Sequence, residues 1–454
     1  MNLTTDTARI DETSQPQQEP SPTGAFDARH PYGAQPVRRR NFLALTAYQV
    51  LLRIGWIFKT ESIIMPAFLD IIAGAGWIRG CLPAMNRFGQ SVPPVLFSER
   101  LRSMPRKKWA LVIFQLMMAA TFLVLAAMWY FAGGVPRPWM PAAFLLLYGL
   151  FFSCTGLAQL AGGTLQGKLV RPNRRGRLLM VSTTIGSVLS IAAAWWLLGG
   201  WLATPKSGFT MIFAFTGGFF VLAAIASAAL QEFADGDDPD RKPSRGRFRD
   251  AWEVLCIDAN FRRLAVVAML FGVVLMLFPH YQALARERLG NSLNHLMIWV
   301  IVQNAGVGLF SIFVGPLADR RGNRLILHLA LFVNAMAPLL ALYLSRQGAF
   351  GDRWFWLVFG MLGMTPVTFK VLLNYTLEIS KTADHPKYLS TLSLCLALPP
   401  MLSPLAGWLV DAAGFEVVLG GGALLILTGA LLSFTLEEPR HTLRGAEELS
   451  ELET

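Results

Sequence analysis

Polar and charged side chains recur at helical spacing inside apolar stretches of this sequence. The first such set, at intervals of four, three and four residues, consists of Gln49, Arg53, Trp56 and Thr60. These intervals place the four side chains on one face of a helix, with Glu61 beside them. A charge at the centre of a membrane helix costs about 2.5–3.5 kcal/mol on insertion scales, so it faces a cavity, a partner or an interface. The stripe therefore predicts a surface that contacts a polar solute.

A second stripe with residues four apart consists of Pro366, Lys370, Asn374 and Glu378. Lys370 lies too deep in its apolar run for its side chain to reach water easily. We expect Arg53 and Lys370 to contact a substrate or each other's counter-charges. The alternative is that they form buried structural pairs, with Glu61 or Glu378 as partners.

Three further polar residues, Gln159, His280 and Gln282, complete the predicted substrate-contacting set. The excess of basic over acidic residues in these stretches favours an anionic or zwitterionic solute. Aromatic residues near them would also suit an amphiphile; these are Tyr48, Trp56, Phe369 and Tyr375.

Titratable groups within the same stretches are candidates for proton coupling, because coupling needs a group that responds to a conformational change. The carboxylates are Glu61, Asp70 and Glu378, and His280 is a further candidate. Lys59 is interpreted instead as a lysine whose ammonium reaches the membrane interface.

The elements that carry these residues are predicted to be membrane-spanning helices. Of 454 residues, 54% are hydrophobic and 15% are charged, whereas a soluble domain has about 45–50% and 25%. A span needs about 20 apolar residues, and the runs of that size are 109–131, 140–163, 178–202, 210–230, 264–283, 294–317, 325–345, 354–376, 388–411 and 416–435. The charged stretch 41–98 fits two more, near 41–68 and 74–97. The prediction is an all-α protein with twelve spans.

Loop charges predict the orientation of these spans. On a twelve-span topology, counted from residue 38 onward, 27 Lys and Arg residues outside the spans lie on the side of the termini and 6 on the other side. Basic loops stay in the cytoplasm, so both termini are expected there.

The predicted organisation is two six-helix bundles with tails and a linker. Residues 1–37, rich in Gln, Pro and acidic residues, are expected to be a disordered cytoplasmic tail. The bundles are 38–231 and 263–436, and residues 437–454 form a second cytoplasmic tail. The linker 232–262 is expected to contain an amphipathic surface helix, or else to be a plain solvated connection.

The short basic turn after the eighth predicted span carries a distinct motif, whose landmarks are Gly315, Asp319, Arg320, Gly322 and Arg324. It resembles the loop signature of the major facilitator superfamily. The corresponding first-half segment, 97–108, keeps the basic cluster but lacks both glycines and the Asp-Arg pair. An echo of the motif runs from Gly407 through Asp411 to Gly414. The helix-five motif typical of drug/proton antiporters in this superfamily is absent from 178–202.

This resemblance implies two six-helix bundles related by a pseudo-two-fold axis along the membrane normal, with substrate between them near the midplane. Spans one, four, seven and ten line the cavity in this family. Arg79, Asn86, Arg87 and Gln90 share one face of the second span. Span two packs peripherally in this family, so Arg79 and Arg87 are interpreted as structural. The resemblance implies a bacterial-type secondary transporter in the inner membrane, a monomer that moves a small molecule by alternating access with protons. The alternative is a non-transporting protein of this fold, acting as an assembly factor or sensor.

Other chemistry is not indicated. The sequence has no GxxxxGK[ST] run for ATP, no HExxH metal pair and no GxSxG nucleophile elbow, and its glycine runs do not follow strands. Four cysteines lack CxxC spacing. We therefore expect no enzyme activity, no cofactor, no metal and no nucleic-acid partner.

Overall fold

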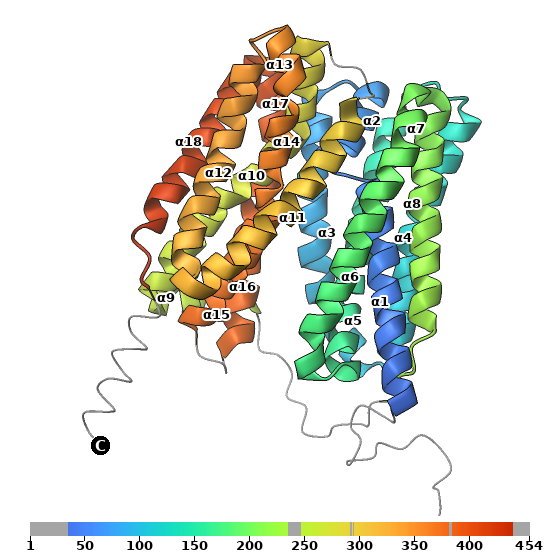
Figure 1. Ribbon diagram of the computed structural model, residues 1–454, viewed down its shortest axis with the longest axis vertical. Coiled ribbons are helices and arrows are strands. Elements are labelled where there is room, and N and C mark those ends of the chain that lie inside the picture. Colours follow the sequence, from blue (N-terminus) through green and yellow to red (C-terminus); the bar gives the residue numbers. More distant parts are fainter. Residues whose placement is uncertain (1–34, 235–246, 291–292, 294, 381–383, 439–454) are drawn as a thin grey trace, which may run out of the picture.

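The computed structural model describes residues 35–234, 247–290, 293, 295–380 and 384–438. Within these residues the chain consists of helices and turns, without a β-strand. The helices form two bundles that stand side by side, one from each half of the chain (Figure 1). The predicted tails 1–37 and 437–454 lie almost entirely outside the described residues, and so does the stretch 235–246 of the predicted linker 232–262.

The N-terminal bundle is built from the elements before residue 230. In chain order these are α1 Gln35–Ile57, α2 Ile64–Ile72, α3 Gly76–Ser103, α4 Lys107–Phe131, α5 Met140–Leu169, α6 Pro172–Ala193, the π-turn η1 Ala194–Leu198, α7 Gly199–Ala203 and α8 Pro205–Ala228. The short helix α9, Arg247–Ile257, lies within the predicted linker and precedes the second bundle.

The C-terminal bundle has the same plan with more interruptions. Its elements are α10 Ala259–Leu289, α11 His295–Arg321, α12 Asn323–Leu344, α13 Ala349–Trp354, α14 Trp356–Leu362, α15 Met364–Ile379, α16 His385–Met401, α17 Ser403–Ala413 and α18 Phe415–Ser433. Collinear short helices here correspond to single predicted spans.

Ten helical stretches of the described chain are long and apolar enough to cross a bilayer. They correspond to the ten apolar runs of the sequence. The two charged spans predicted near 41–68 and 74–97 correspond to α1 with α2, and to α3. The total of twelve spans stays a prediction.

The first predicted span is not one continuous helix, and proline explains why. The chain between α1 and α2 turns at 58–63, where the Thr60 carbonyl accepts the N–H groups of Ile64 and Met65 at 3.0 and 3.1 Å. Pro66 has no N–H to donate, and its ring would collide with the carbonyl four residues earlier in an unbroken helix. The chain therefore opens at Thr60, and this opening creates the site described below.

Aromatic side chains fill the core of the N-terminal bundle around this opening. Phe68 of α2 is fully buried and packs edge-on against Phe213 and Trp129, with ring centroids 4.8 and 5.1 Å away. Such edge-to-face pairs add to the burial of apolar area. The packing fixes α2 relative to α4 and α8 and holds the helix break in one place.

Candidate functional site

The break between α1 and α2 buries an ion pair. Lys59 is completely buried, and its Nζ lies 2.9 Å from Oε1 of Glu61, whose side chain is 17% exposed. The prediction that Lys59 reaches the interface is wrong, because the turn at 58–63 directs its side chain into the bundle. The alternative pairing of Arg53 with Glu61 is not observed either.

Three aromatic rings surround the Lys59 ammonium. Its Nζ lies 3.6 Å from the ring centroid of Trp56, 4.3 Å from that of Phe152 and 5.0 Å from that of Phe151. Each ring face carries negative potential, so the three rings and Glu61 together replace the water that burial removes. Trp56, which is predicted to contact substrate, contacts Lys59 in this structure.

The second oxygen of Glu61 belongs to a chain of amides on α3. The side-chain amide of Asn86 donates to Glu61 Oε2, and Gln90 Nε2 donates to the side-chain oxygen Oδ1 of Asn86. Gln90 also lines a cavity of about 200 Å³ between α3 and α16, with Ser390 and Ser393 on the opposite wall. The amide chain thus connects the carboxylate at the helix break to a polar space between the bundles.

Arg87 of α3 lies across the same interface, over the ring of Phe369 in α15 at 4.6 Å from the centroid. The prediction that the second span is peripheral is wrong, because α3 contacts the other bundle along its length. The helical spacing of Asn86, Arg87 and Gln90 predicts a shared face of α3. In the structure this face lies toward the C-terminal bundle.

A second polar cluster crosses the N-terminal bundle nearer the start of α1. Ser182 of α6 donates to Gln49 Oε1 at 2.5 Å, and Gln49 Nε2 donates to Gln166 of α5 at 3.2 Å. One turn further along α1, half-buried Arg53 packs beside Gly186 of α6. Arg53 makes neither a hydrogen bond nor an ion pair within the described residues.

The two bundles are joined through Asp70 at the end of α2. Its carboxylate lies 2.5 Å from Arg79 of α3, accepts a hydrogen bond of 2.8 Å from Gln282 and is 3.8 Å from Arg286. Gln282 and Arg286 belong to α10, in the other half of the chain. Asp70, predicted as a proton-coupling group, is thus part of a charged network that holds the bundles together.

A second set of bonds joins the bundles at the same end. The carboxylate of Asp411, in α17, accepts both N–H groups of the first turn of α3, from Gly76 at 2.9 Å and Trp77 at 3.2 Å. A carboxylate at a helix N-terminus is favoured by the helix dipole. Nearby, Ser403 donates to the Gly80 carbonyl.

This crossing of α3 and α17 requires glycine. A Cβ on Gly407 would collide with the Gly76 carbonyl, and one on Gly76 would lie 2.6 Å from the Gly407 carbonyl. The echo of the loop signature at Gly407 and Asp411 therefore forms a contact between the halves. Figure 1 shows the ribbons converging at this end and diverging at the end where α1 begins.

The predicted loop signature forms the turn between α11 and α12. Gly322 has φ +89°, a conformation that other residues rarely adopt, and Glu438 packs over it. Arg324 donates to the Phe434 carbonyl at 2.9 Å, and Arg320 is exposed. The side chains at 315 and 319 lie outside the described residues.

The remaining predicted residues are not brought into one cluster. Lys370 and Asn374 are exposed on α15, and Lys370 makes no hydrogen bond or ion pair within the described chain. Glu378 accepts a hydrogen bond of 2.8 Å from Asn323 rather than pairing with Lys370.

His280 is fully buried, and neither of its ring nitrogens has a hydrogen-bond partner within the described residues. In addition, Thr60 donates to the Ile57 carbonyl at 2.6 Å, and Gln159 is exposed.

The comparisons with known proteins agree with this architecture. Residues 282–452 match the family model described as the Major Facilitator Superfamily. A structure of a variant of the nucleoside transporter NupG superposes with a TM-score of 0.68 at 12% identity, over 87% of this chain and 100% of that one. The chain has the major facilitator fold.

Two further structures of this fold are similarly close. A bacterial homolog of the human lysosomal transporter Spinster, inward-facing and unoccupied, gives a TM-score of 0.61 at 14% identity, over 91% of this chain and 99% of that one. A bacterial homologue of the iron transporter ferroportin, in the inward-facing state, gives 0.64 at 12% identity, over 89% and 99%. No curated protein sequence matches this chain significantly.

The family model and the solved structures agree with the fold that the sequence resemblance implied. The family match begins at residue 282 and leaves out the N-terminal half, where the loop signature lacks its glycines. Identities of 12–14% show the major facilitator fold alone, so the solute has to be argued from this chain's own residues.

Proposed function

We propose that this protein is a proton-coupled secondary transporter of small organic anions that works by alternating access. The observation that carries this proposal is the polar cluster of Lys59, Glu61, Asn86 and Gln90 at a helix break between two bundles. Discontinuous spanning helices provide binding groups near the membrane midplane of transporters. The bundles are bonded together at one end, which gives them a hinge-like arrangement.

The anionic substrate is argued from charges that lack partners. Arg53, Arg87 and Lys370 make no hydrogen bond or ion pair within the described residues, and Arg87 lies over the face of Phe369. The acids Glu61 and Asp70 are both neutralised by basic neighbours. Uncompensated cations in low dielectric attract an anion, and the ring of Phe369 offers it an apolar surface.

Proton coupling is assigned to Glu61. Its carboxylate is shared between the Lys59 ammonium and the Asn86 amide, so protonation would weaken both bonds at once. A proton that crosses a potential of 100 mV releases about 2.3 kcal/mol, which can bias the bundle equilibrium more than tenfold. Asp70 and Glu378 are held by other side chains and serve the structure.

The membrane and orientation follow from the loop charges. We assign the protein to a bacterial cytoplasmic membrane with both termini in the cytoplasm, where it acts as a monomer. In that orientation the bonds of Asp70 and Asp411 close the outer side, and the conformation described here is inward-facing.

A ligand screen followed by transport measurements tests the function. Organic anions that raise the melting temperature of the purified protein are assayed for uptake into proteoliposomes, with and without an imposed pH gradient. We expect gradient-dependent uptake, and a loss of at least tenfold in Lys370→Ala. The matched control is Arg353→Ala, an exposed arginine in α13 without a side-chain partner in the described chain.

Two outcomes would contradict the proposal. Uptake that ignores the pH gradient would remove proton coupling. Failure of every solute to bind or move, with a folded protein, would favour the non-transporting assembly factor or sensor.

A further inference from the structure

A groove on the N-terminal bundle lies away from the contacts between the two halves. It has a volume of about 760 Å³ and runs between the first turns of α1 and the end of α8. Its walls include Leu43 and Ala47 of α1 and, opposite them, Ala226 and Ala229. The small alanines leave a channel with apolar sides.

Two arginines flank the groove where α1 begins. Arg40 donates from Nε to the Ala229 carbonyl at 3.1 Å, which fixes its guanidinium across the groove and leaves its terminal N–H groups available. Arg39 is exposed and makes no hydrogen bond or ion pair within the described chain. Within the described residues, no carboxylate neutralises these two positive charges.

Other basic residues at this end of the bundle have partners within the protein. Lys168 lies 3.0 Å from Glu232, and Lys108 donates to the Leu230 carbonyl at 3.0 Å. Glu232 also accepts the backbone N–H of Lys108 at 2.7 Å. The described part of the chain thus provides partners for the neighbouring lysines but places no acid on the two groove arginines.

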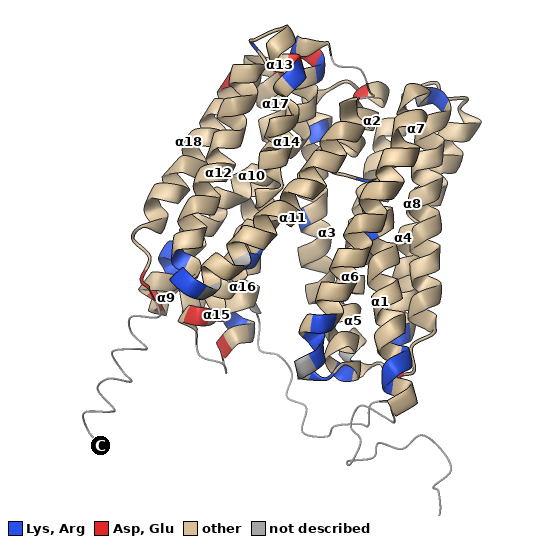
Figure 2. Cartoon of the chain, viewed as in Figure 1, with Lys and Arg blue, Asp and Glu red and all other residues tan. Residues whose placement is uncertain are grey.

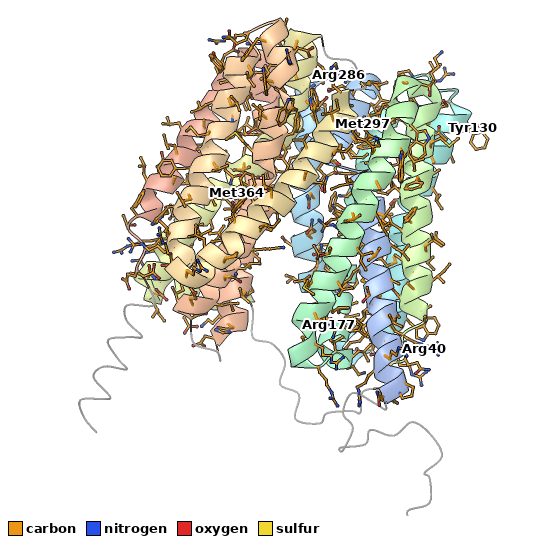
Figure 3. All side chains as sticks on the ribbon, in the orientation of Figure 1. Arg40, Tyr130, Arg177, Arg286, Met297 and Met364 are labelled. Carbon is orange, nitrogen blue, oxygen red and sulfur yellow. The ribbon has the colours of Figure 1, made fainter. Side chains whose placement is uncertain are left out.

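The position of the groove determines what can reach it. Figure 3 shows Arg40 and Arg177 at the same end of the bundle, and Figure 2 shows this end to be rich in Lys and Arg. Basic residues of this kind lie at the level of anionic lipid headgroups, while the apolar walls extend from there along the spanning part of α1. Guanidinium groups bind phosphate with paired hydrogen bonds.

We propose that the α1–α8 groove binds an anionic phospholipid, with its phosphate on Arg39 and Arg40 and an acyl chain along the alanine walls. Charge complementarity at the mouth and apolar walls inside match the two parts of such a lipid. The site is separate from the transport pathway and does not depend on the solute.

Native mass spectrometry of the delipidated full-length protein tests this site. Phosphatidylglycerol should bind in preference to phosphatidylcholine, and Arg39→Ala/Arg40→Ala should weaken it about tenfold or more. Arg174→Ala/Arg177→Ala removes the same charge at the same end but outside the groove, and should leave most of the binding. Equal losses in both double variants, or no preference for phosphatidylglycerol, would overturn the proposal.

Two further variants distinguish lipid binding inside the groove from lipid binding to a charged surface. Ala47→Trp fills the channel and keeps both arginines, so it should also reduce phosphatidylglycerol retention; full retention would contradict the acyl-chain part. A photo-crosslinking residue at Leu43 should capture a phospholipid in membranes. Capture of residues 1–34 of the same chain would show instead that the protein fills its own groove.

Discussion

At the scale of single residues, the defining feature is a lysine that is fully buried and yet satisfied. Lys59 has one carboxylate at 2.9 Å and three aromatic faces around its ammonium. A buried pair contributes little net stability, but removing one partner leaves the other as an uncompensated charge. Single substitutions in this pair should therefore lower the stability of the protein strongly, and a matched double substitution should lower it only weakly.

Replacing Glu61 alone should lower stability sharply. Glu61→Gln keeps the size of the side chain but leaves the Lys59 ammonium with only aromatic faces, at a cost of about 3–5 kcal/mol. The double variant Lys59→Met/Glu61→Gln removes both charges and should recover most of the loss. Thermal unfolding of the purified variants measures this. Additive losses in the double variant would show that the two side chains do not act as a pair.

The sequence predicted the members of this site better than their arrangement. Helical spacing grouped Trp56 with Arg53, and Asn86 with Gln90, because the period of a helix decides which side chains share a face. It could not show that Lys59 turns inward, because that depends on the unwound turn at Thr60. Asp411 was noted only as an echo of a motif, since its partners are backbone N–H groups 334 and 335 residues away in the chain.

At the scale of elements, apolar length predicted the helices and proline modified them. The predicted runs 325–345 and 416–435 agree with α12 and α18 to within two residues at each end. The predicted run 388–411 is divided at Leu402, next to Pro399, Pro400 and Pro404. Mean hydropathy over a window of residues measures how apolar a segment is. It does not detect that a proline lacks the backbone N–H that a continuous helix needs.

The crossing of α3 and α17 should depend on the missing side chain at Gly407. Gly407→Ala places a Cβ against the Gly76 carbonyl, so the two helices must separate and the bundles must open at this end. Gly420→Ala in α18 is the matched control, because a Cβ there meets nothing within 4 Å. Electron–electron distances between spin labels at Val135 and Gln347, both exposed in loops at the joined end, report the change.

We expect a longer distance, or a second longer population, in Gly407→Ala and no change in Gly420→Ala. A distance distribution in Gly407→Ala that matches the parent protein would show that the crossing tolerates a methyl group. The helix contact would then not control the closed end.

At the scale of the whole molecule, charge is distributed by end rather than by bundle. Lys and Arg gather at the end where α1 begins and where the chain leaves α18, on both bundles (Figure 2). Translocation disfavours basic loops, so we expect this end to lie in the cytoplasm. The same asymmetry is visible in the sequence, because it depends on loop composition and not on packing.

Reporter fusions should therefore locate four points of the chain on two sides. The termini, at residues 1 and 454, should both be cytoplasmic, whereas insertions at Gly133, in the loop between α4 and α5, and at Gln347, between α12 and α13, should lie outside. Gly133 follows the first three predicted spans, which are α1 with α2, α3 and α4, so an outside position requires an odd number of them to cross the membrane. If Gly133 and residue 1 were on the same side, the first 131 residues would cross an even number of times, and the pairing of two six-helix halves would fail.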